Sequence, residues 1–136
     1  MLCINVKSNS LLNSPEIRLI AIYRPPNTHF ELFLNKFELI LNSVKPKQET
    51  YIIGDFNINF LDSMTNNTLS FQNTLYSHCF YPLITALTRI TVTTSSLIDN
   101  IFTNTSEPHN NGIVVSDFSD HFPIYTITNN SNKLIH

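Results

Sequence analysis

The chain has 136 residues, of which 42% are hydrophobic and 13% charged, and its formal net charge at pH 7 is −2. This length fits one domain, and the apolar fraction excludes a chain that stays disordered because of excess charge. The small net charge excludes a broad basic surface for nucleic acid, so any phosphate contact must be local. The two cysteines, Cys3 and Cys79, have no further Cys or His at ligand spacing, which argues against a zinc site and a disulfide framework.

The sequence is not expected to contain a secretory signal or a membrane-spanning segment. Residues 1–10 lack the basic, apolar and small-residue regions of a secretory signal. The longest segment without a charged residue, 63–88, is too rich in Asn, Ser and Thr to span a bilayer. We therefore expect an intracellular protein without a membrane partner.

Two apolar segments near the start of the chain predict a pair of strands. Residues 17–24 are rich in Ile and end before Pro25, which cannot continue a helix and cannot donate to a strand ladder. Residues 1–6 have a similar composition. The polar segment 8–15 between them is expected to be a connecting loop, which makes the two strands antiparallel.

Two helices are predicted from apolar residues at helical spacing. The first spans 29–44, and Thr28 with Glu31 at its start indicates a capping box. The second runs from about 68 to 80, with Phe71 on its apolar side.

The other segments predict strands. Residues 51–60 form a short strand that continues into a loop, and three β-rich segments follow: 96–104, 112–117 and 122–128. This order of elements predicts an α/β fold of the α+β kind, in which helices pack on one face of a mixed sheet. The strands are apolar at consecutive positions, which is typical of a sheet covered on both faces. Because two helices cover one face, we expect the chain alone to self-associate through the other.

Three of the aspartates interrupt these strand-like segments: Asp55, Asp99 and Asp120. Aspartate is a poor strand residue and an unpaired buried carboxylate is costly, so these positions need a reason. Either each one caps a turn, or all three meet at one edge of the sheet together with Asn57 and His121. A strand that continued through Asp55 and Asn57 would place both on one face. Carboxylates beside an imidazole suit Mg²⁺ or Mn²⁺ and phosphate chemistry better than zinc.

Four segments in order resemble the motif series of the endonuclease/exonuclease/phosphatase superfamily. They are AIYRPPN (21–27), IIGDFNI (52–58), SSLIDNIFTN (95–104) and SDHFPI (119–124). The series is most similar to the apurinic-endonuclease-like domain of non-LTR retrotransposons, and the resemblance covers residues 17 to 128. It implies a four-layer helix, sheet, sheet, helix sandwich, of which residues 1–136 would form one half. The family's glutamate metal ligand has no counterpart before Tyr23, so the resemblance implies a partial domain whose N-terminal portion is missing.

The resemblance also implies roles for the residues that bind substrate. Tyr23 corresponds to a tyrosine that contacts the scissile phosphate. Asp55 and Asn57 correspond to the pair that positions the attacking water and the phosphate oxygens. Thr88, in the segment LTRIT, corresponds to a DNA-contacting threonine. The competing interpretation of Tyr23 is an ordinary residue at the end of a strand.

A second group of implied roles concerns the histidine. Asp99 matches the carboxylate that orients the catalytic histidine, His121, and Asp120 matches the aspartate at or near the metal. A carboxylate that bonds one imidazole nitrogen fixes the tautomer and favours the protonated ring, which can then donate to a phosphate. The competing interpretation of His121 is an interior histidine whose hydrogen bonds are satisfied.

These observations predict a Mg²⁺- or Mn²⁺-dependent phosphodiesterase that nicks DNA as retrotransposon endonucleases do, and that is nuclear if it acts on DNA. Its expected partners are DNA, the missing N-terminal half and a reverse transcriptase of the same polyprotein. The alternative is a non-catalytic remnant or a binding module derived from a transposon endonuclease. A phosphatase or lipid phosphodiesterase of the same superfamily is the third interpretation.

Overall fold

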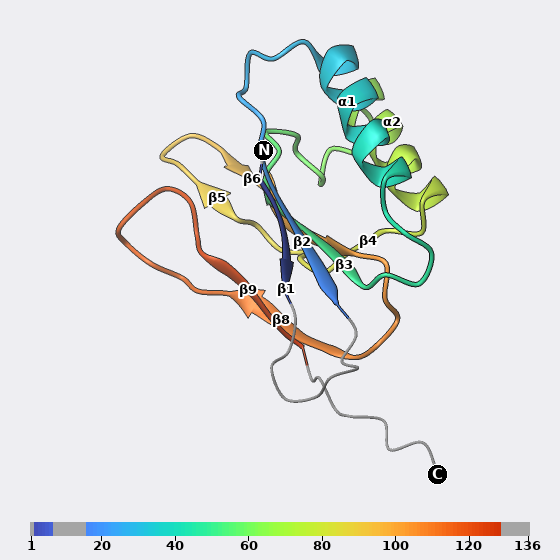
Figure 1. Ribbon diagram of the computed structural model, residues 1–136. Coiled ribbons are helices and arrows are strands. Elements are labelled where there is room, and N and C mark those ends of the chain that lie inside the picture. Colours follow the sequence, from blue (N-terminus) through green and yellow to red (C-terminus); the bar gives the residue numbers. More distant parts are fainter. Residues whose placement is uncertain (1, 7–15, 129–136) are drawn as a thin grey trace.

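A central sheet with two helices on one of its faces forms the framework of the protein (Figure 1). The computed structural model describes residues 2–6 and 16–128. The two helices are α1 (Phe30–Asn42) and α2 (Asn66–Ser77). The strands are β1 (Leu2–Val6), β2 (Ile17–Tyr23), β3 (Thr50–Asp55), β4 (Tyr81–Pro82), β5 (Arg89–Ile90), β6 (Ser95–Ser96), β7 (Asp99–Thr103), β8 (His109–Ile113) and β9 (Ile124–Thr128). The mixed α/β architecture expected from the sequence is confirmed. Neither helix is long and apolar enough to cross a membrane.

The central sheet has the strand order β1-β2-β3-β7-β4 and is mixed. β1 and β2 are antiparallel, as predicted, while β2 and β3 are parallel and are connected through α1. β7 then pairs antiparallel with β3. A Cβ atom at Gly54 would lie 1.8 Å from the carbonyl oxygen of Ile22. Glycine is therefore needed for the close approach of β2 and β3. The predicted loop 8–15 lies outside the described residues.

Helix α1 begins one residue later than the predicted capping box requires. His29 is the N-cap, and its side chain makes no capping hydrogen bond. Glu31 is therefore the second helical residue, whereas a capping box needs glutamate at the third. The capping-box prediction is wrong for this reason, although a carboxylate in the first turn still favours the positive end of the helix dipole. The helix itself is confirmed, and it buries Phe37 and Leu41 against the sheet.

Helix α2 begins and ends earlier than the predicted range of about 68 to 80. Its N-cap is Thr65, whose hydroxyl oxygen accepts the backbone N–H of Thr68. The helix stops at Ser77, and Cys79 then adopts a left-handed backbone conformation with φ of 59°. This conformation ends the helix, because few residues other than glycine adopt it inside regular structure.

Aromatic rings fill the space between the helices and the sheet. The ring centroid of Phe71 lies 4.9 Å from that of Phe37 and 5.4 Å from that of Phe56. The ring of Phe56 also meets Phe102 edge-on at 5.2 Å. Edge-to-face and tilted contacts of this kind add to the free energy gained by burying the rings. The core therefore fixes α1 and α2 on β3 and β7.

The segment predicted as one strand at 96–104 is divided into β6 and β7. Between them, the backbone N–H of Leu97 donates to the side-chain oxygen of Asn59, and that of Ile98 donates to the hydroxyl of Thr88. Side-chain acceptors thus replace strand partners, so the ladder is interrupted there. The strand predicted at 112–117 is also displaced, and β8 lies at His109–Ile113 because its partner strand begins only after Pro123.

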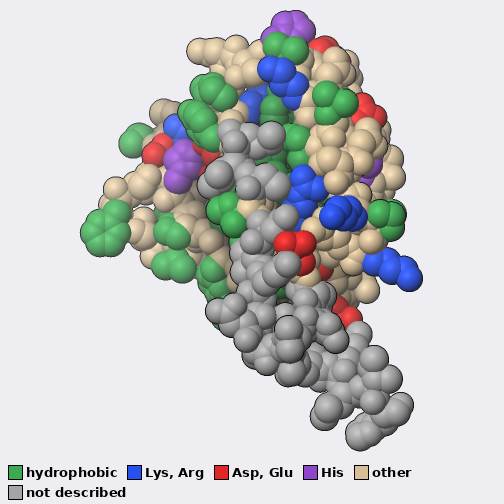
Figure 2. All heavy atoms as spheres, viewed as in Figure 1, with side chains coloured by type: hydrophobic (Ala, Val, Ile, Leu, Met, Phe, Trp, Pro, Cys, Tyr) green, Lys and Arg blue, Asp and Glu red, His purple; other side chains and the backbone are tan. Residues whose placement is uncertain are grey.

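The second face of the sheet is partly covered by the β8–β9 hairpin. Ile101 of β7 is fully buried on this side, in a cluster with Ile84 and Leu97 against which Ile113 and Ile124 pack. The expectation that this face is entirely uncovered is therefore corrected. Further along the face, however, Ile4, Leu19 and Ile53 remain exposed by 48%, 36% and 37%. Figure 2 shows further hydrophobic side chains over the side of the molecule where the hairpin lies.

This exposed apolar surface is expected to make residues 1–136 self-associate when they are produced alone. Sedimentation velocity at increasing concentration should show dimers or larger species. Leu19→Lys places a charge on the exposed face and should shift the protein towards monomer. Leu39→Lys is the matched control, because Leu39 is 71% exposed on α1, on the other side of the sheet, and should have little effect. A wild-type chain that stays monomeric at high concentration would contradict this expectation.

Candidate active site

The strand register brings three predicted site residues into one row at an edge of the sheet. Tyr23 ends β2, Asp55 ends β3 and Asp99 begins β7. Tyr23 is the register partner of Asp55, and Asp55 is the register partner of Asp99. Residues that pair in this way point to the same side of a sheet. Two carboxylates that are 44 residues apart in the sequence are therefore direct neighbours.

His121 joins this row from the loop before β9. Its Nδ1 atom lies 3.0 Å and 3.2 Å from the two carboxylate oxygens of Asp99. An isolated bridge between His121 and Arg89 of β5 holds the backbone at this position. Ligand atoms of Asp55, Asp99 and His121 all lie within 4.8 Å of one another. This is the only group of that kind found in the part of the chain that the structure describes.

The two paired carboxylates shape the electrostatics of the site. Burial raises the pKa of Asp55 above its ordinary value, and the neighbouring Asp99 carboxylate raises it further. The backbone N–H of Asn57 and the electrostatic influence of His121 and Arg89 act in the opposite direction on the same pKa. A bound cation would stabilise two adjacent carboxylates in the same way, because it neutralises their repulsion.

The donor set fits a hard divalent cation. Asp55 and Asp99 supply carboxylate oxygens, whereas Nδ1 of His121 is already occupied by Asp99. Two carboxylates are too few for a closed metal cage, but Mg²⁺ commonly keeps several water ligands and binds through one or two carboxylates and a phosphate. The residues that are present therefore fit Mg²⁺ or Mn²⁺ better than a structural zinc ion.

Asn57 follows Asp55 in a tight turn rather than in a strand. Its φ angle is 49°, a left-handed conformation that asparagine tolerates better than most residues. The turn is closed by the Asn57 backbone N–H, which donates to Asp55 Oδ1 at 3.0 Å. One amide hydrogen of Asn57 Nδ2 donates to the backbone carbonyl of Arg24 at 2.8 Å. The condition under which Asp55 and Asn57 would share one strand face is not met, because β3 ends at Asp55.

Tyr23 and Asp120 occupy different surroundings. The side chain of Tyr23 is 64% exposed at the end of β2, beside the row of carboxylates. The structure does not bring the Asp120 carboxylate into the cluster, because its Oδ2 accepts a hydrogen bond from Nε of Arg89 at 2.8 Å. The same bond holds the pKa of Asp120 below its usual range. The structure therefore provides no support for Asp120 as a direct metal ligand.

Thr88, which the resemblance pairs with a DNA-contacting residue, is fully buried. Its hydroxyl oxygen accepts the backbone N–H groups of Ile98 and Asp99. In this structure no part of the side chain is exposed for contact with DNA. Its hydroxyl instead binds the backbone at the start of β7.

Arg24 is a site-supporting residue that the sequence analysis missed. Its side chain is 6% exposed, and its guanidinium donates to the backbone carbonyls of Phe56, Asn57 and Thr28 at 3.0 to 3.2 Å. It lies 5.5 Å from the ring centroid of Phe33. Burial lowers its pKa. The signal in the sequence is an arginine directly before Pro25, at the end of a buried strand.

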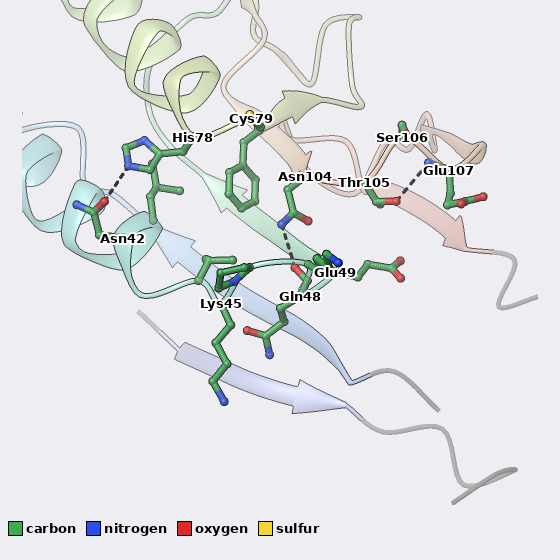
Figure 3. Close-up of a pocket in the computed structure, with 15 residues that line it drawn as sticks. Asn42, Lys45, Gln48, Glu49, His78, Cys79, Asn104, Thr105, Ser106 and Glu107 are labelled. Atoms are coloured by element: carbon green, nitrogen blue, oxygen red, sulfur yellow. Dashed lines mark hydrogen bonds between the residues drawn. The ribbon is translucent and has the colours of Figure 1, made fainter. Parts of the chain in front are cut away.

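A cavity of about 820 Å³ lies at the opposite ends of β3 and β7 (Figure 3). It is lined by the segment that follows α1, by the end of α2 and by the segment that follows β7. Figure 3 shows Asn104 bonded to Gln48 and His78 bonded to Asn42 at its wall. None of the clustered carboxylates lines this cavity, so the candidate active site lies at the sheet edge and not in this cavity.

Replacing Asp55 by asparagine is expected to stabilise the metal-free protein at neutral pH. Because folding raises its pKa, the ionised carboxylate disfavours the folded state, and stability falls as the pH rises from the unfolded pKa through the folded pKa. Asp55→Asn removes this loss and keeps the oxygen that accepts from Asn57. Thermal unfolding with a chelator should show a larger gain at pH 7 than at pH 4, while Mn²⁺ binding weakens. A variant less stable than wild type at pH 7 would contradict this account.

Solved structures share this fold. The endonuclease domain of TRAS1, a telomere-specific non-LTR retrotransposon, superposes with a TM-score of 0.77 at 17% identity, covering 96% of this chain and 64% of that one. An endonuclease/exonuclease/phosphatase family protein from Leptotrichia buccalis gives 0.63 at 17% identity, with 90% and 51% covered. Beta toxin from Staphylococcus aureus gives 0.62 at 15% identity, with 91% and 55% covered. This chain thus spans about half to two thirds of their lengths.

The α/β fold of this chain is the fold of these solved structures, among them an endonuclease domain and an endonuclease/exonuclease/phosphatase family protein. A family model described as endonuclease-reverse transcriptase matches residues 17–125. The chain belongs to that family. No curated protein sequence matches the chain.

Proposed function

We propose that this chain is the part of a metal-dependent phosphodiesterase that cleaves one strand of DNA, as expected for a retrotransposon endonuclease. The observation that carries the proposal is the contact between Asp99 and His121 beside Asp55, at an open edge of the sheet. The family match and the fold shared with the TRAS1 endonuclease domain support DNA as the substrate. No separate observation favours a phosphatase or a lipid phosphodiesterase.

The residues of the cluster have complementary chemical roles in this proposal. Asp99 holds Nδ1 of His121, which leaves Nε2 free to donate to a phosphate oxygen as its negative charge grows. Asp55 accepts the proton of the attacking water. Tyr23 and Asn57 contact the phosphate beside Asp55. Mg²⁺ or Mn²⁺ held by Asp55 and Asp99 would neutralise the charge of the phosphate.

The extent of the chain limits the proposal to a part of the enzyme. The chain spans 64% of the TRAS1 endonuclease domain, so we propose activity for a protein in which the rest of that fold is also present. The exposed apolar surface at Ile4, Leu19 and Ile53 is where such a remainder would pack. A reverse transcriptase in the same polyprotein and a nuclear location are further parts of this proposal.

The test is the nicking of supercoiled plasmid by a fusion that places the N-terminal part of the TRAS1 endonuclease domain before this chain. We expect the fusion to relax the plasmid with Mg²⁺ and to stop when a chelator is added. Nicking that survives chelation would refute the metal dependence. A folded fusion that binds Mn²⁺ and DNA but never nicks would favour the alternative, a non-catalytic remnant or binding module.

A further inference from the structure

The buried side chain of Thr88 is bonded to the segment that carries Asp99. Its Oγ1 atom lies 3.1 Å from the backbone nitrogen of Ile98 and 3.0 Å from that of Asp99. A hydroxyl oxygen has two lone pairs, so one threonine can accept both N–H groups. Thr88 therefore fixes the backbone at the first residue of β7, from which the Asp99 carboxylate projects.

The backbone around Thr88 holds the segment that carries His121. The carbonyl oxygen of Thr88 accepts the backbone N–H of Phe122 at 2.7 Å. The next residue, Arg89, forms the isolated bridge with His121. Thr88 thus bonds Asp99 through its side chain and, through its main chain, Phe122, the residue that follows His121.

A third connection leads from Thr88 to Asp55. The carbonyl oxygen of Ile98, whose own N–H is held by Thr88, accepts the backbone N–H of Phe56 at 2.9 Å. Phe56 directly follows Asp55 and is fully buried. Hydrogen bonds from Thr88 therefore reach Asp99 directly, the residue after His121 directly, and the residue after Asp55 through Ile98.

We infer that Thr88 is a positioning residue that sets the distance between Asp99 and His121, and that it does not touch DNA. Loss of its hydroxyl would leave two inward-facing backbone N–H groups without an acceptor, and the start of β7 would have to move to reach other partners. A shift of the backbone there moves the Asp99 carboxylate and therefore alters its hydrogen bond to His121. The effect on cleavage rests on the proposed function, whereas the effect on the hydrogen bond does not.

The experiment follows the Nδ1 proton of His121 by NMR in the chain without metal or DNA. Wild type should show a downfield Nδ1–H resonance from the bond to Asp99, and Thr88→Val should lose it. Thr88→Ser keeps the hydroxyl and should restore it. Thr103→Val is the matched control, because Thr103 is a buried threonine at the other end of β7 whose hydroxyl donates to the carbonyl of Thr50.

Mn²⁺ titration of the same variants gives an independent readout. Thr88→Val should bind Mn²⁺ about 10- to 100-fold more weakly than wild type, as expected when the support of a metal ligand is removed. Thr88→Ser and Thr103→Val should bind nearly as well as wild type. If Thr88→Val retains both the resonance and Mn²⁺ binding but loses DNA affinity, Thr88 is a DNA contact and the inference is overturned.

Amide hydrogen exchange on wild type provides a measurement that needs no variant to fold. The N–H groups of Ile98 and Asp99 should be protected as strongly as those of the buried strand β3, because both are bonded to a fully buried oxygen. Rapid exchange at these two positions would overturn the inference. Since none of these measurements uses DNA cleavage, absence of nicking would count against the proposed function alone.

Discussion

His121→Ala is expected to lower the rate of DNA cleavage by about 10²–10⁴-fold, the usual contribution of a positioned acid–base or electrostatic residue. The imidazole lies 3.0 Å from Asp99 and within the cluster that contains Asp55. Its removal eliminates the donor to the phosphate but leaves both carboxylates in place. The measurement is single-turnover nicking of supercoiled plasmid by the fusion protein with Mg²⁺.

His78→Ala is the matched control for this effect. His78 lies at the end of α2, and its ring bonds Asn42 and the carbonyl of Thr74, at the wall of the large cavity. Its loss should change stability slightly and leave the cleavage rate nearly unchanged. If the two variants lose activity equally, or if His121→Ala loses less than about tenfold, His121 has a structural role and not a catalytic one.

Arg24→Met is expected to lower the free energy of unfolding by about 2–4 kcal/mol. Methionine fills much of the same volume but leaves the carbonyls of Thr28, Phe56 and Asn57 without the donor that now binds them. Relief from burying a cation offsets part of this loss. Because two of these carbonyls belong to the turn after Asp55, Mn²⁺ binding should weaken as well. Denaturant unfolding and Mn²⁺ titration measure the two effects.

Arg18→Met serves as the control for Arg24→Met. The guanidinium of Arg18 bonds Ser43 in an exposed environment, so its removal should cost less than about 1 kcal/mol. Arg24→Lys keeps the charge but cannot reach three carbonyls in the same geometry, and it should recover only part of the lost stability. A fully stable Arg24→Met variant would show that the turn around Asn57 is held by its other bonds.

Local patterns in the sequence predicted most of the elements of the fold. Apolar residues at helical spacing identified α1 and α2, and apolar segments bounded by proline or polar residues identified β1, β2 and β3. The predictions failed where a distant residue supplied the hydrogen-bond partner. Thr88 and Asn59 divide the segment at 96–104 into two strands, and Pro123 decides where β8 and β9 can pair.

The residues of the candidate site could be predicted from the sequence, but the hydrogen bonds that hold them in place could not. Aspartates inside apolar segments, followed by an Asp-His pair, signalled Asp55, Asp99 and His121, which the structure brings together. Their catalytic roles stay predictions. The predicted roles of Asp120 at the metal and of Thr88 at DNA also stay predictions; what the sequence could not show is that Asp120 bonds Arg89 and that Thr88 is buried, because both depend on residues distant in the chain.

The sequence by itself determined which residues can carry the chemistry, because carboxylate, imidazole and amide groups are properties of the side chains alone. Tertiary structure decided which of them meet. The register of three strands makes Tyr23, Asp55 and Asp99 neighbours, and the buried Thr88 accepts hydrogen bonds from the backbone of Asp99 and of Phe122, the residue after His121. Such contacts join segments tens of residues apart, and their geometry depends on the packed core rather than on local preference.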